Sequence, residues 1–355
     1  MRKTILVVTE TMGIDGPERV ISELVKQWSK EGYDITIVLT RSKTREATYA
    51  LPDDIHVLKI DAYAKGGKLA RLNEIRQLRA ILRTHSDAVA VSLMISTSFS
   101  LAMASIGLKT RVVLSERNDP GKVPFTALQR KLRDLSFEIA DKIVFQTQDA
   151  MYYFPQRIQR KGTIIFNPVN PDLPERYNGT RRKVFVAAGR LAPQKNFPML
   201  IQAFTRFSKE CLDYRLDIFG EGPDREILQQ LIDSNGMTDR IRMPGFSKNV
   251  YAEMVDSAAY VSASDYEGMS NSMLEALAMG IPVICTDCPI GGAKTVIENE
   301  KNGLLIPVGD EERMYQALLR VTKETKFADW MSRNAYSIRD RLNIRDIASQ
   351  WSELF

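Results

Sequence analysis

Two glutamates, Glu267 and Glu275, stand eight positions apart in a stretch that reads EGMSNSMLE. The residues before it are apolar and β-compatible, and those after it are strong helix formers, so the stretch predicts a loop leading from a strand into a helix. Small polar residues suited to cap that helix follow Gly268 and Met269: Ser270, Asn271 and Ser272. Free N–H groups at a helix start attract an anion, most often a phosphate. Such a loop suits a ligand with both hydroxyls and phosphates, for example a nucleotide sugar.

The same nine residues are also compatible with a plain strand, turn and amphipathic helix. Glu267 would then be solvated, and Glu275 would be a surface charge. A second loop bears on the choice, because Arg190 and Lys195 lie together after the predicted strand Lys183–Ala188 and just before a helix. Two cations there can hold a diphosphate without a metal. As an isolated pair they would be surface charges, but at the ends of strands of one sheet the two loops together favour a diphosphate-binding site.

Short apolar runs alternate with helical patterns along the whole chain, which predicts an α/β fold with parallel sheets. At 355 residues the chain is long enough for two domains. The alternation begins at Thr4–Thr9 and restarts at Lys183–Ala188, after a proline-rich linker at Asn167–Thr180. The sequence therefore predicts two doubly wound, Rossmann-like domains, residues 1–170 and 181–334, facing each other across a central cleft.

Charge is distributed unevenly. Residues 1–180 carry 27 Lys and Arg against 20 Asp and Glu, a net charge of +7, whereas residues 181–355 carry 22 against 24, a net charge of −2. The basic first half suggests an anionic partner, and an anionic membrane surface or a phosphorylated acceptor would fit. Nucleic acid is not expected, because no nucleic-acid-binding motif is present. The predicted helix Leu69–Arg83 carries four arginines, which form either a solvated face or a membrane-facing one.

Few cysteines and histidines are available for metal or redox chemistry. Cys285 and Cys288 form a CxxC that closes a strand instead of opening a helix, so a structural role is expected. A zinc site would need further ligands, and His56 and His85 are distant in sequence. Free cysteines suit a reducing cytoplasm, and the first residues do not resemble a signal peptide. The uncharged stretch Val89–Leu108 predicts a strand, a polar loop and a buried helix in preference to a membrane span.

With these motifs in place, the chain resembles the retaining glycosyltransferases of the GT-B fold, family GT4. The matching segments of the second half are Gly189-Arg190-Leu191, Gln194-Lys195-Asn196, Gly220-Glu221-Gly222-Pro223, Gly245-Phe246, Glu267 to Glu275, Gly280-Ile281-Pro282-Val283 and Gly303-Leu304-Leu305. The first half matches more loosely, at Gly16-Pro17-Glu18-Arg19 and Asn167-Pro168-Val169. The resemblance implies that a C-terminal helix, at about 335–355, packs back on the first domain.

The resemblance also implies roles for individual residues. Arg190 and Lys195 bind the donor diphosphate, Glu275 bonds the ribose hydroxyls, and Glu267 faces the donor sugar near its reacting carbon. Glu267, Arg190 and Lys195 are thus the expected catalytic residues. Further donor contacts are expected at Gly16, Gly245, Phe246, Gly268, Met269, Ser270 and Asn271. The acceptor side is expected to include Glu18, Arg19, Glu116, Arg117 and Asp119.

One departure from the family concerns the loop Glu116–Pro120, which follows a strand at the sheet edge where doubly wound folds bind ligands, although it could be a plain polar turn. Many family members have a histidine here, where this chain has Arg117, so a histidine base is not expected. In a same-face reaction the leaving diphosphate oxygen takes the acceptor's proton. Lys195 and Arg190 then stabilise the charge that builds on the diphosphate.

No metal and no other cofactor is expected, since the nucleotide sugar is a substrate. A metal-dependent GT-A transferase would need an Asp-x-Asp motif. The nearest candidate is Asp265-Tyr266-Glu267, whose second acid fits better as the first glutamate of the pair.

On the strength of the resemblance, the sequence predicts a cytoplasmic transferase at the inner face of the plasma membrane. It would move a hexose or N-acetylhexosamine, with retention, from a UDP-linked donor to a saccharide acceptor that is lipid-linked, for instance to polyprenyl diphosphate. Bacterial capsule, O-antigen or glycan biosynthesis is the expected setting. Three alternatives stay open: a nucleotide-sugar epimerase or hydrolase on the same fold, a non-catalytic sugar-nucleotide binder, and an NAD-dependent oxidoreductase, although the last lacks a GxGxxG motif.

Overall fold

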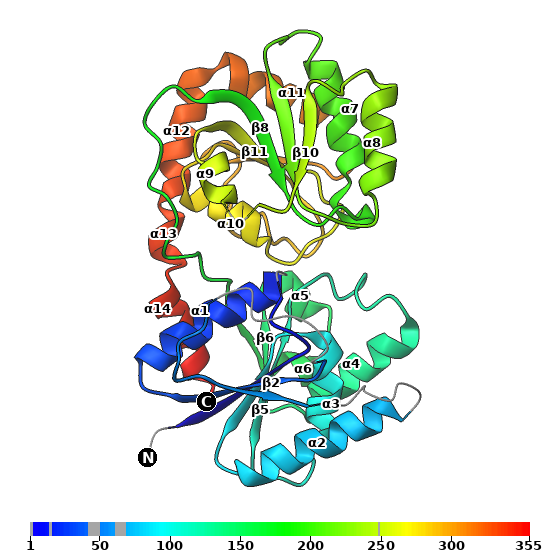
Figure 1. The fold of residues 1–355 in the computed structure, drawn as a ribbon, viewed down its shortest axis with the longest axis vertical. Helices are drawn as coiled ribbons and strands as arrows, with labels where there is room; N and C mark the ends of the chain where they lie inside the picture. Colours follow the sequence, from blue (N-terminus) through cyan, green and yellow to red (C-terminus); the bar gives the residue numbers. More distant parts are fainter. Residues whose placement is uncertain (1–2, 14–15, 42–49, 61–68, 248) are drawn as a thin grey trace. The chain divides into compact units, whose positions relative to one another are not determined.

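The computed structural model describes residues 3–13, 16–41, 50–60, 69–247 and 249–355. The chain forms two compact units, which we call the first unit (Met1–Pro168 with Asn343–Phe355) and the second unit (Val169–Leu342). Figure 1 shows the two sheets with their covering helices. The chain passes from one unit to the other inside the proline-rich segment that the sequence marks as a linker, and it returns to the first unit at Asn343.

The first unit is built on a seven-stranded parallel sheet of order β3-β2-β1-β4-β5-β6-β7. Its strands are β1 (Thr4–Thr9), β2 (Asp34–Leu39), β3 (His56–Lys59), β4 (Val89–Ser92), β5 (Arg111–Glu116), β6 (Lys142–Phe145) and β7 (Gly162–Ile164). Its helices are α1 (Gly16–Lys30), α2 (Ala70–Thr84), α3 (Ile95–Ser105), α4 (Ala127–Ile139), α5 (Gln148–Tyr152), α6 (Gln156–Gln159) and α14 (Ile344–Ser352). The central strands are continuous apolar runs because helices cover both faces of the sheet.

The second unit repeats this plan with a six-stranded parallel sheet of order β10-β9-β8-β11-β12-β13. Its strands are β8 (Arg182–Ala188), β9 (Arg215–Phe219), β10 (Ile241–Gly245), β11 (Ser257–Ser262), β12 (Val283–Thr286) and β13 (Leu304–Ile306). Its helices are the 3₁₀ helix η1 (Pro193–Lys195), α7 (Phe197–Phe207), α8 (Arg225–Ser234), α9 (Val250–Met254), α10 (Asn271–Ala278), α11 (Glu311–Lys323), α12 (Thr325–Tyr336) and α13 (Ile338–Arg341).

Both sheets reverse their strand order once, between β1 and β4 in the first unit and between β8 and β11 in the second. Parallel sheets of this kind bind ligands beyond the carboxyl ends of the strands, at the point where the order reverses. The predicted α/β fold class with two doubly wound, Rossmann-like sheets is confirmed.

The chain around Thr295 forms hydrogen-bonded turns, with the N–H of Thr295 bonded to the carbonyl of Gly291. From Glu311 onward the chain forms four helices. The uncharged stretch Val89–Leu108 is a strand followed by a helix, as predicted. No helix in the described ranges combines the length and the apolar character that a membrane crossing requires.

Aromatic contacts fix the last helix, α14, to the first unit. The ring of Trp28 on α1 lies edge-on to Trp351 at 6.4 Å and to Phe355 at 5.2 Å between centroids. The indole N–H of Trp28 also donates a hydrogen bond of 3.3 Å to the carbonyl of Ala348. Both tryptophans are fully buried, so the end of the chain is part of the core of the first unit.

We therefore expect Trp351→Ala to destabilise the first unit by about 3–5 kcal/mol, because a fully buried indole is replaced by a cavity. Urea denaturation followed by fluorescence would measure the loss. Trp330→Ala, which removes a 43% exposed indole from the second unit, is the matched control and should cost much less. Equal effects of the two substitutions would contradict the role given to α14.

Candidate functional site

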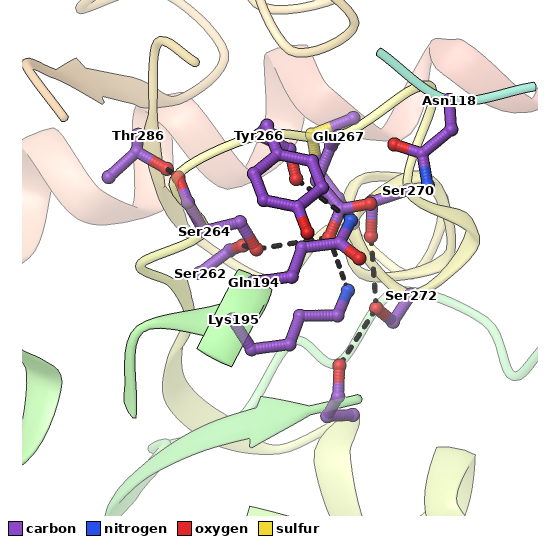
Figure 2. A network of polar contacts seen from close by, with 12 residues as sticks. Asn118, Gln194, Lys195, Ser262, Ser264, Tyr266, Glu267, Ser270, Ser272 and Thr286 are labelled. Atoms are coloured by element: carbon purple, nitrogen blue, oxygen red, sulfur yellow. Dashed lines mark hydrogen bonds and ion pairs between the residues drawn. The ribbon is translucent and has the colours of Figure 1, made fainter. Parts of the chain in front are cut away.

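Two loops follow the neighbouring strands β8 and β11, at the point where the strand order of the second unit reverses. The loop after β8 carries Arg190 and ends in η1 with Lys195, and the loop after β11 carries Glu267 and leads into α10. Asn196 joins η1 to α7: it adopts a left-handed conformation (φ 44°), and its side chain caps the helix by accepting from the N–H of Met199 at 3.3 Å. Figure 2 shows the residues where the two loops meet.

An ion pair joins the two loops. The ammonium of Lys195 donates to Oε1 of Glu267, and the hydroxyl of Ser264 donates to the same oxygen at 3.0 Å. Burial acts to lower the pKa of Lys195, but the negative charge of Glu267 and the neighbouring Tyr260 outweigh it, so the pKa of Lys195 lies above its usual value. Lys195 therefore stays cationic beside Glu267.

The amide side chains of the two residues that flank Lys195, Gln194 and Asn196, reinforce the contact between the loops. The side-chain amide of Gln194 donates to the backbone carbonyl of Tyr266 at 2.8 Å, and the backbone carbonyl of Gln194 accepts from the N–H of Asp265 at 2.9 Å. The side chain of Asn196 donates to Oδ1 of Asp265 at 2.7 Å. Three consecutive residues of one loop thus hold the other, which orients the ammonium of Lys195 and the carboxylate of Glu267 before any ligand arrives.

Glycines let neighbouring loops approach the two site loops at van der Waals distance. A Cβ atom on Gly220, which has φ +136°, would lie 2.0 Å from the carbonyl oxygen of Gly189. A Cβ atom on Gly292 would lie 1.7 Å from the carbonyl oxygen of Gly268. No side chain fits at either position, so these backbones are fixed by direct contact with the loops after β9 and β12.

The predicted cysteine pair lies beside this site without taking part in its chemistry. Cys285 and Cys288 are both buried, and together with Met273 they line a small cavity next to Glu267. Burial raises the pKa of both thiols, that of Cys288 to about 12. The two sulfurs are therefore protonated, and thiols in that state are poor nucleophiles and poor metal ligands.

Glu275 lies on the buried side of α10, where it is 5% exposed. Its Oε1 accepts a hydrogen bond of 3.0 Å from the hydroxyl of Tyr251, on α9. Tyr251 was not identified from the sequence, since it precedes Glu275 by 24 positions on a separate short helix and belongs to no motif. The bond shows that Tyr251 orients the carboxylate of Glu275.

Other expected donor residues lie around the same sheet edge. Ser270 occupies the N-cap position of α10, but its side chain does not cap the helix and instead lies 3.2 Å from the hydroxyl of Ser272. Gly245 ends β10 with φ +87°, and Phe246 follows it with a largely exposed ring. Arg190 is exposed, and no acidic partner is found for it among the described residues. Gly268 and Met269 lie between Glu267 and the N-cap of α10, and Asn271 is the first residue of that helix.

The residues expected on the acceptor side belong to the first unit, as does Gly16, which was expected to contact the donor. Gly16, Glu18 and Arg19 form the first turn of α1, at the strand-order reversal, whereas residues 14 and 15 of the predicted loop lie outside the described residues. Glu18 is buried, and its Oε1 accepts a hydrogen bond from the hydroxyl of Thr11. Its carboxylate is thus fixed at the carboxyl end of β1.

The loop after β5 brings the other predicted residues together. Oε1 of Glu116 accepts from the N–H groups of Arg117 at 3.0 Å and Asn118 at 3.2 Å, while burial raises the pKa of Glu116 to about 8 against the opposing effect of a neighbouring arginine. The guanidinium of Arg117 donates to the side chain of Asn167, and burial lowers the pKa of Arg117 to about 9. Oδ1 of Asp119 accepts from the N–H of Gly121 at 2.8 Å.

Arg133, on α4, supports this loop and was not identified from the sequence. Its fully buried guanidinium donates to the carbonyls of Pro120 at 2.7 Å and Val123 at 3.1 Å, and lies 3.6 Å from Oε2 of Glu116. It also stacks over the ring of Phe154, 4.7 Å from the ring centroid. The loop that carries the predicted acceptor residues is therefore fixed from beneath by one buried cation.

The doubly wound pair of sheets and the cationic site at a strand-order reversal define a GT-B glycosyltransferase, and comparisons with known proteins agree. A family model described as "Glycosyl transferases group 1" matches residues 182–324, and one described as "Glycosyltransferase Family 4" matches residues 14–173. The chain belongs to the group 1 glycosyltransferases, family GT4. The predicted family and the predicted enzyme class, a hexosyltransferase, are confirmed, and the oxidoreductase alternative is set aside.

Two similar curated proteins come from Campylobacter jejuni. One, named N-acetylgalactosamine-N,N'-diacetylbacillosaminyl-diphospho-undecaprenol 4-alpha-N-acetylgalactosaminyltransferase, is 26% identical over 89% of this chain and 89% of its own length. The other, named GalNAc-alpha-(1->4)-GalNAc-alpha-(1->3)-diNAcBac-PP-undecaprenol alpha-1,4-N-acetyl-D-galactosaminyltransferase, is 24% identical over 98% of this chain and 96% of its own length.

Solved structures share the fold. Sucrose-phosphate synthase from Thermosynechococcus elongatus has a TM-score of 0.88 at 15% identity and covers 99% of this chain and 98% of its own. Anabaena HepE in complex with UDP and glucose has a TM-score of 0.82 at 16% identity, covering 99% of each chain. At these identities the likeness shows the GT-B fold.

If the donor is UDP-linked and Glu275 bonds its ribose, as the sequence predicts, Tyr251→Phe should weaken UDP binding roughly two- to tenfold, the range for one lost hydrogen bond, by loosening the carboxylate of Glu275. Isothermal titration with UDP would measure the change. Tyr315→Phe removes another tyrosine–glutamate bond of the second unit, to Glu210, and should leave UDP binding unchanged. A Tyr251→Phe variant that binds UDP as tightly as the wild type would refute the positioning role.

Proposed function

We propose that this glycosyltransferase moves a hexose or N-acetylhexosamine from a UDP-sugar to a lipid-linked saccharide, with retention and without a metal ion. One observation carries the proposal: the ion pair between Lys195 and Glu267 joins a diphosphate-binding loop to the loop that would face the sugar. A cation suited to the leaving group and a carboxylate suited to the transferred group are thereby held side by side.

The donor would lie along the carboxyl ends of β8 and β11. Arg190, exposed and without an acidic partner in the described chain, and Lys195 would bind the diphosphate, with the N-terminus of α10 adding N–H groups. Glu275 would accept hydrogen bonds from the ribose hydroxyls, oriented by Tyr251. Glu267 would face the donor sugar.

Retention follows if the acceptor hydroxyl attacks the sugar from the side on which the diphosphate leaves. The bond from the acceptor oxygen to the anomeric carbon forms as the bond from that carbon to the diphosphate oxygen breaks, and the proton of the hydroxyl passes to that leaving oxygen. Lys195 and Arg190 would stabilise the charge on the diphosphate, which is the largest charge change in this step. No histidine base is needed.

Metal independence is supported by the hydrogen bonds of the one acidic pair close to an Asp-x-Asp pattern. Asp265 accepts from Asn196, and Glu267 accepts from Lys195 and Ser264, so both carboxylates are engaged by protein donors. Two cations on the facing loop would neutralise the diphosphate in place of a divalent ion.

The identity of donor and acceptor is supported by the relatives. The two Campylobacter proteins are named as N-acetylgalactosaminyltransferases acting on undecaprenol-diphosphate-linked saccharides, and HepE is described in complex with UDP-glucose. We extend this to bacterial glycan assembly in the cytoplasm, at the inner face of the plasma membrane, with peripheral attachment to anionic lipid. Free cysteines and the basic first half of the chain support that location. A screen of nucleotide sugars for thermal stabilisation, followed by mass analysis of products on polyprenyl-diphosphate-linked acceptors, tests the assignment, and release of free sugar alone would indicate a hydrolase.

The two glutamates should separate in kinetics. We expect Glu275→Ala to raise the donor KM, because it removes a charge-assisted bond to ribose worth about 1.5–3 kcal/mol. Glu267→Ala should act mainly on kcat, since Glu267 is assigned to the reacting sugar. Steady-state kinetics with varied donor would distinguish the two, and the reverse pattern would exchange the assigned roles.

Turnover should persist in excess EDTA. Arg190→Ala and Lys195→Ala should each lower kcat by roughly 10²–10³, the scale for loss of one preorganised stabiliser. Lys195→Arg should not restore full activity, because a planar guanidinium cannot replace a compact ammonium beside Glu267, whose Oε1 also accepts from Ser264. Loss of turnover on chelation that Mg²⁺ or Mn²⁺ restores would overturn the metal-free mechanism.

A further inference from the structure

Helix α4 presents large apolar side chains to solvent. Leu128 is 67% exposed and Leu135 is 43% exposed, and Lys131 stands between them on the same side of the helix, as the spacing of three and four residues requires. The opposite side of α4 is buried, through Arg133 and Phe137 among others. An amphipathic helix on a folded unit normally turns its apolar side inward, so a second apolar side needs an explanation.

Phe125, which precedes the N-cap of this helix, extends the exposed apolar surface. The N-cap itself is Thr126, which forms a capping box with Gln129. A side chain at the preceding position often packs on the fourth helical residue, but here that residue is Arg130, which donates to the carbonyls of Pro124 at 3.0 Å and Phe125 at 3.2 Å. The ring of Phe125 is consequently left 73% exposed on a fixed backbone.

Positive charge borders these apolar side chains. Lys122 and Lys131 are exposed, and neither pairs with an acid in the described parts of the chain. The nearby acids are engaged, Glu138 by Arg157 and Asp134 by Arg133. Residues 117–161 contain nine Lys and Arg against five Asp and Glu. Exposed Phe and Leu among unpaired lysines are the pattern of a surface that inserts shallowly into an anionic bilayer.

We propose that this surface, the α4 face (Lys122, Phe125, Leu128, Lys131 and Leu135), docks the first unit on an anionic phospholipid bilayer. Phe125 and Leu128 would enter the interface between headgroups and acyl chains, while Lys122 and Lys131 would lie over the lipid phosphates. Two sources of attraction act together, apolar burial and charge, and neither requires a bound substrate.

The place of the α4 face in the chain agrees with a membrane-bound acceptor, a part of the argument that rests on the proposed function. The segment that ends in Phe125 begins at Glu116 and contains Arg117 and Asp119, the residues expected on the acceptor side. Arg133 bonds to the carbonyls of Pro120 and Val123 in the middle of that segment. The acceptor loop and the lipid-facing residues are thus one structural element.

The arginines of α2, which the sequence offered as a membrane-facing surface, are a weaker candidate. Arg79 donates through Nη1 to the carbonyls of Ala104 at 2.8 Å and Ile106 at 2.7 Å, so it ties α2 to the end of α3. Exposed leucines also lie at the start of α2, at Leu69 and Leu72, but the α4 face adds the exposed ring of Phe125 and lies within a fully described region.

The test measures binding of the full chain to vesicles by sedimentation, without donor or acceptor. Wild type should bind vesicles of phosphatidylglycerol and phosphatidylcholine more tightly than phosphatidylcholine alone. The double variant F125S/L128S should lose at least about tenfold in partition coefficient, given the apolar area removed. L212S/I227S is the matched control, since it removes side chains that are 75% and 64% exposed from the second unit, and it should bind like wild type.

Charge reversal gives a second measurement. The variant K122E/K131E should weaken binding to the anionic vesicles by roughly fivefold or more for each lysine, with little effect on neutral vesicles, and added salt should weaken wild-type binding. An unchanged melting temperature and unchanged UDP affinity would show that these variants are folded. UDP affinity also separates this proposal from the proposed function. Vesicle binding without UDP binding would count against the proposed function, whereas UDP binding without vesicle binding would count against docking of the α4 face.

Two results would overturn the proposal. In one, wild type fails to bind anionic vesicles, or F125S/L128S binds them as wild type does. In the other, sedimentation velocity without lipid shows a concentration-dependent dimer of wild type that F125S/L128S abolishes, in which case the α4 face is a contact between two copies of this chain.

Discussion

The ion pair between Lys195 and Glu267 is the interaction on which the second unit's site depends. Each partner is largely withdrawn from water, and a buried charge without its counter-charge is strongly destabilising. The loops after β8 and β11 must therefore remain in contact, and Gln194 and Asn196 fix how they meet. In the proposed function an arriving diphosphate would share Lys195 with Glu267, and Arg190, which is exposed, would supply the second positive charge.

This arrangement follows from topology more than from any single residue. Because β8 and β11 are paired in parallel, their carboxyl ends lie side by side at the reversal of strand order. The short loops that follow them therefore meet, although they are distant in sequence. The glycines at 220 and 292 then permit backbone contact from the flanking loops. A rigid sheet edge, closely packed loops and one paired charge together preorganise the site, which is the condition for electrostatic stabilisation of a leaving group.

The sequence was sufficient to predict features that depend on neighbouring residues in the chain. These are the strands, which are apolar runs, the linker near Pro168, and the charged residues that directly follow strands. It was insufficient where a side chain acts through the fold. Tyr251 reaches Glu275 only because α9 and α10 are neighbours, and no period or motif signals that contact. In the sequence, Arg133 resembles any cation of an amphipathic helix, but its guanidinium bonds to the carbonyl of Pro120. Arg79, one of the four arginines of the predicted helix Leu69–Arg83, likewise bonds to the carbonyl of Ala104 in α3. Such contacts are set by tertiary packing, which pattern alone does not determine.

Burial also sets the charge of the loop after β5. With a pKa of about 8, Glu116 is mostly neutral at pH 7, so it does not cancel the charge of Arg133 beside it. Arg117, although its pKa is lowered to about 9, remains protonated at that pH. Arg133 is paired with Asp134, so Arg117 and Asp119 are the remaining charges of the loop while Glu116 is neutral. As the pH rises through 8, ionisation of Glu116 would add a negative charge to this loop, which a phosphate-bearing acceptor would meet less favourably.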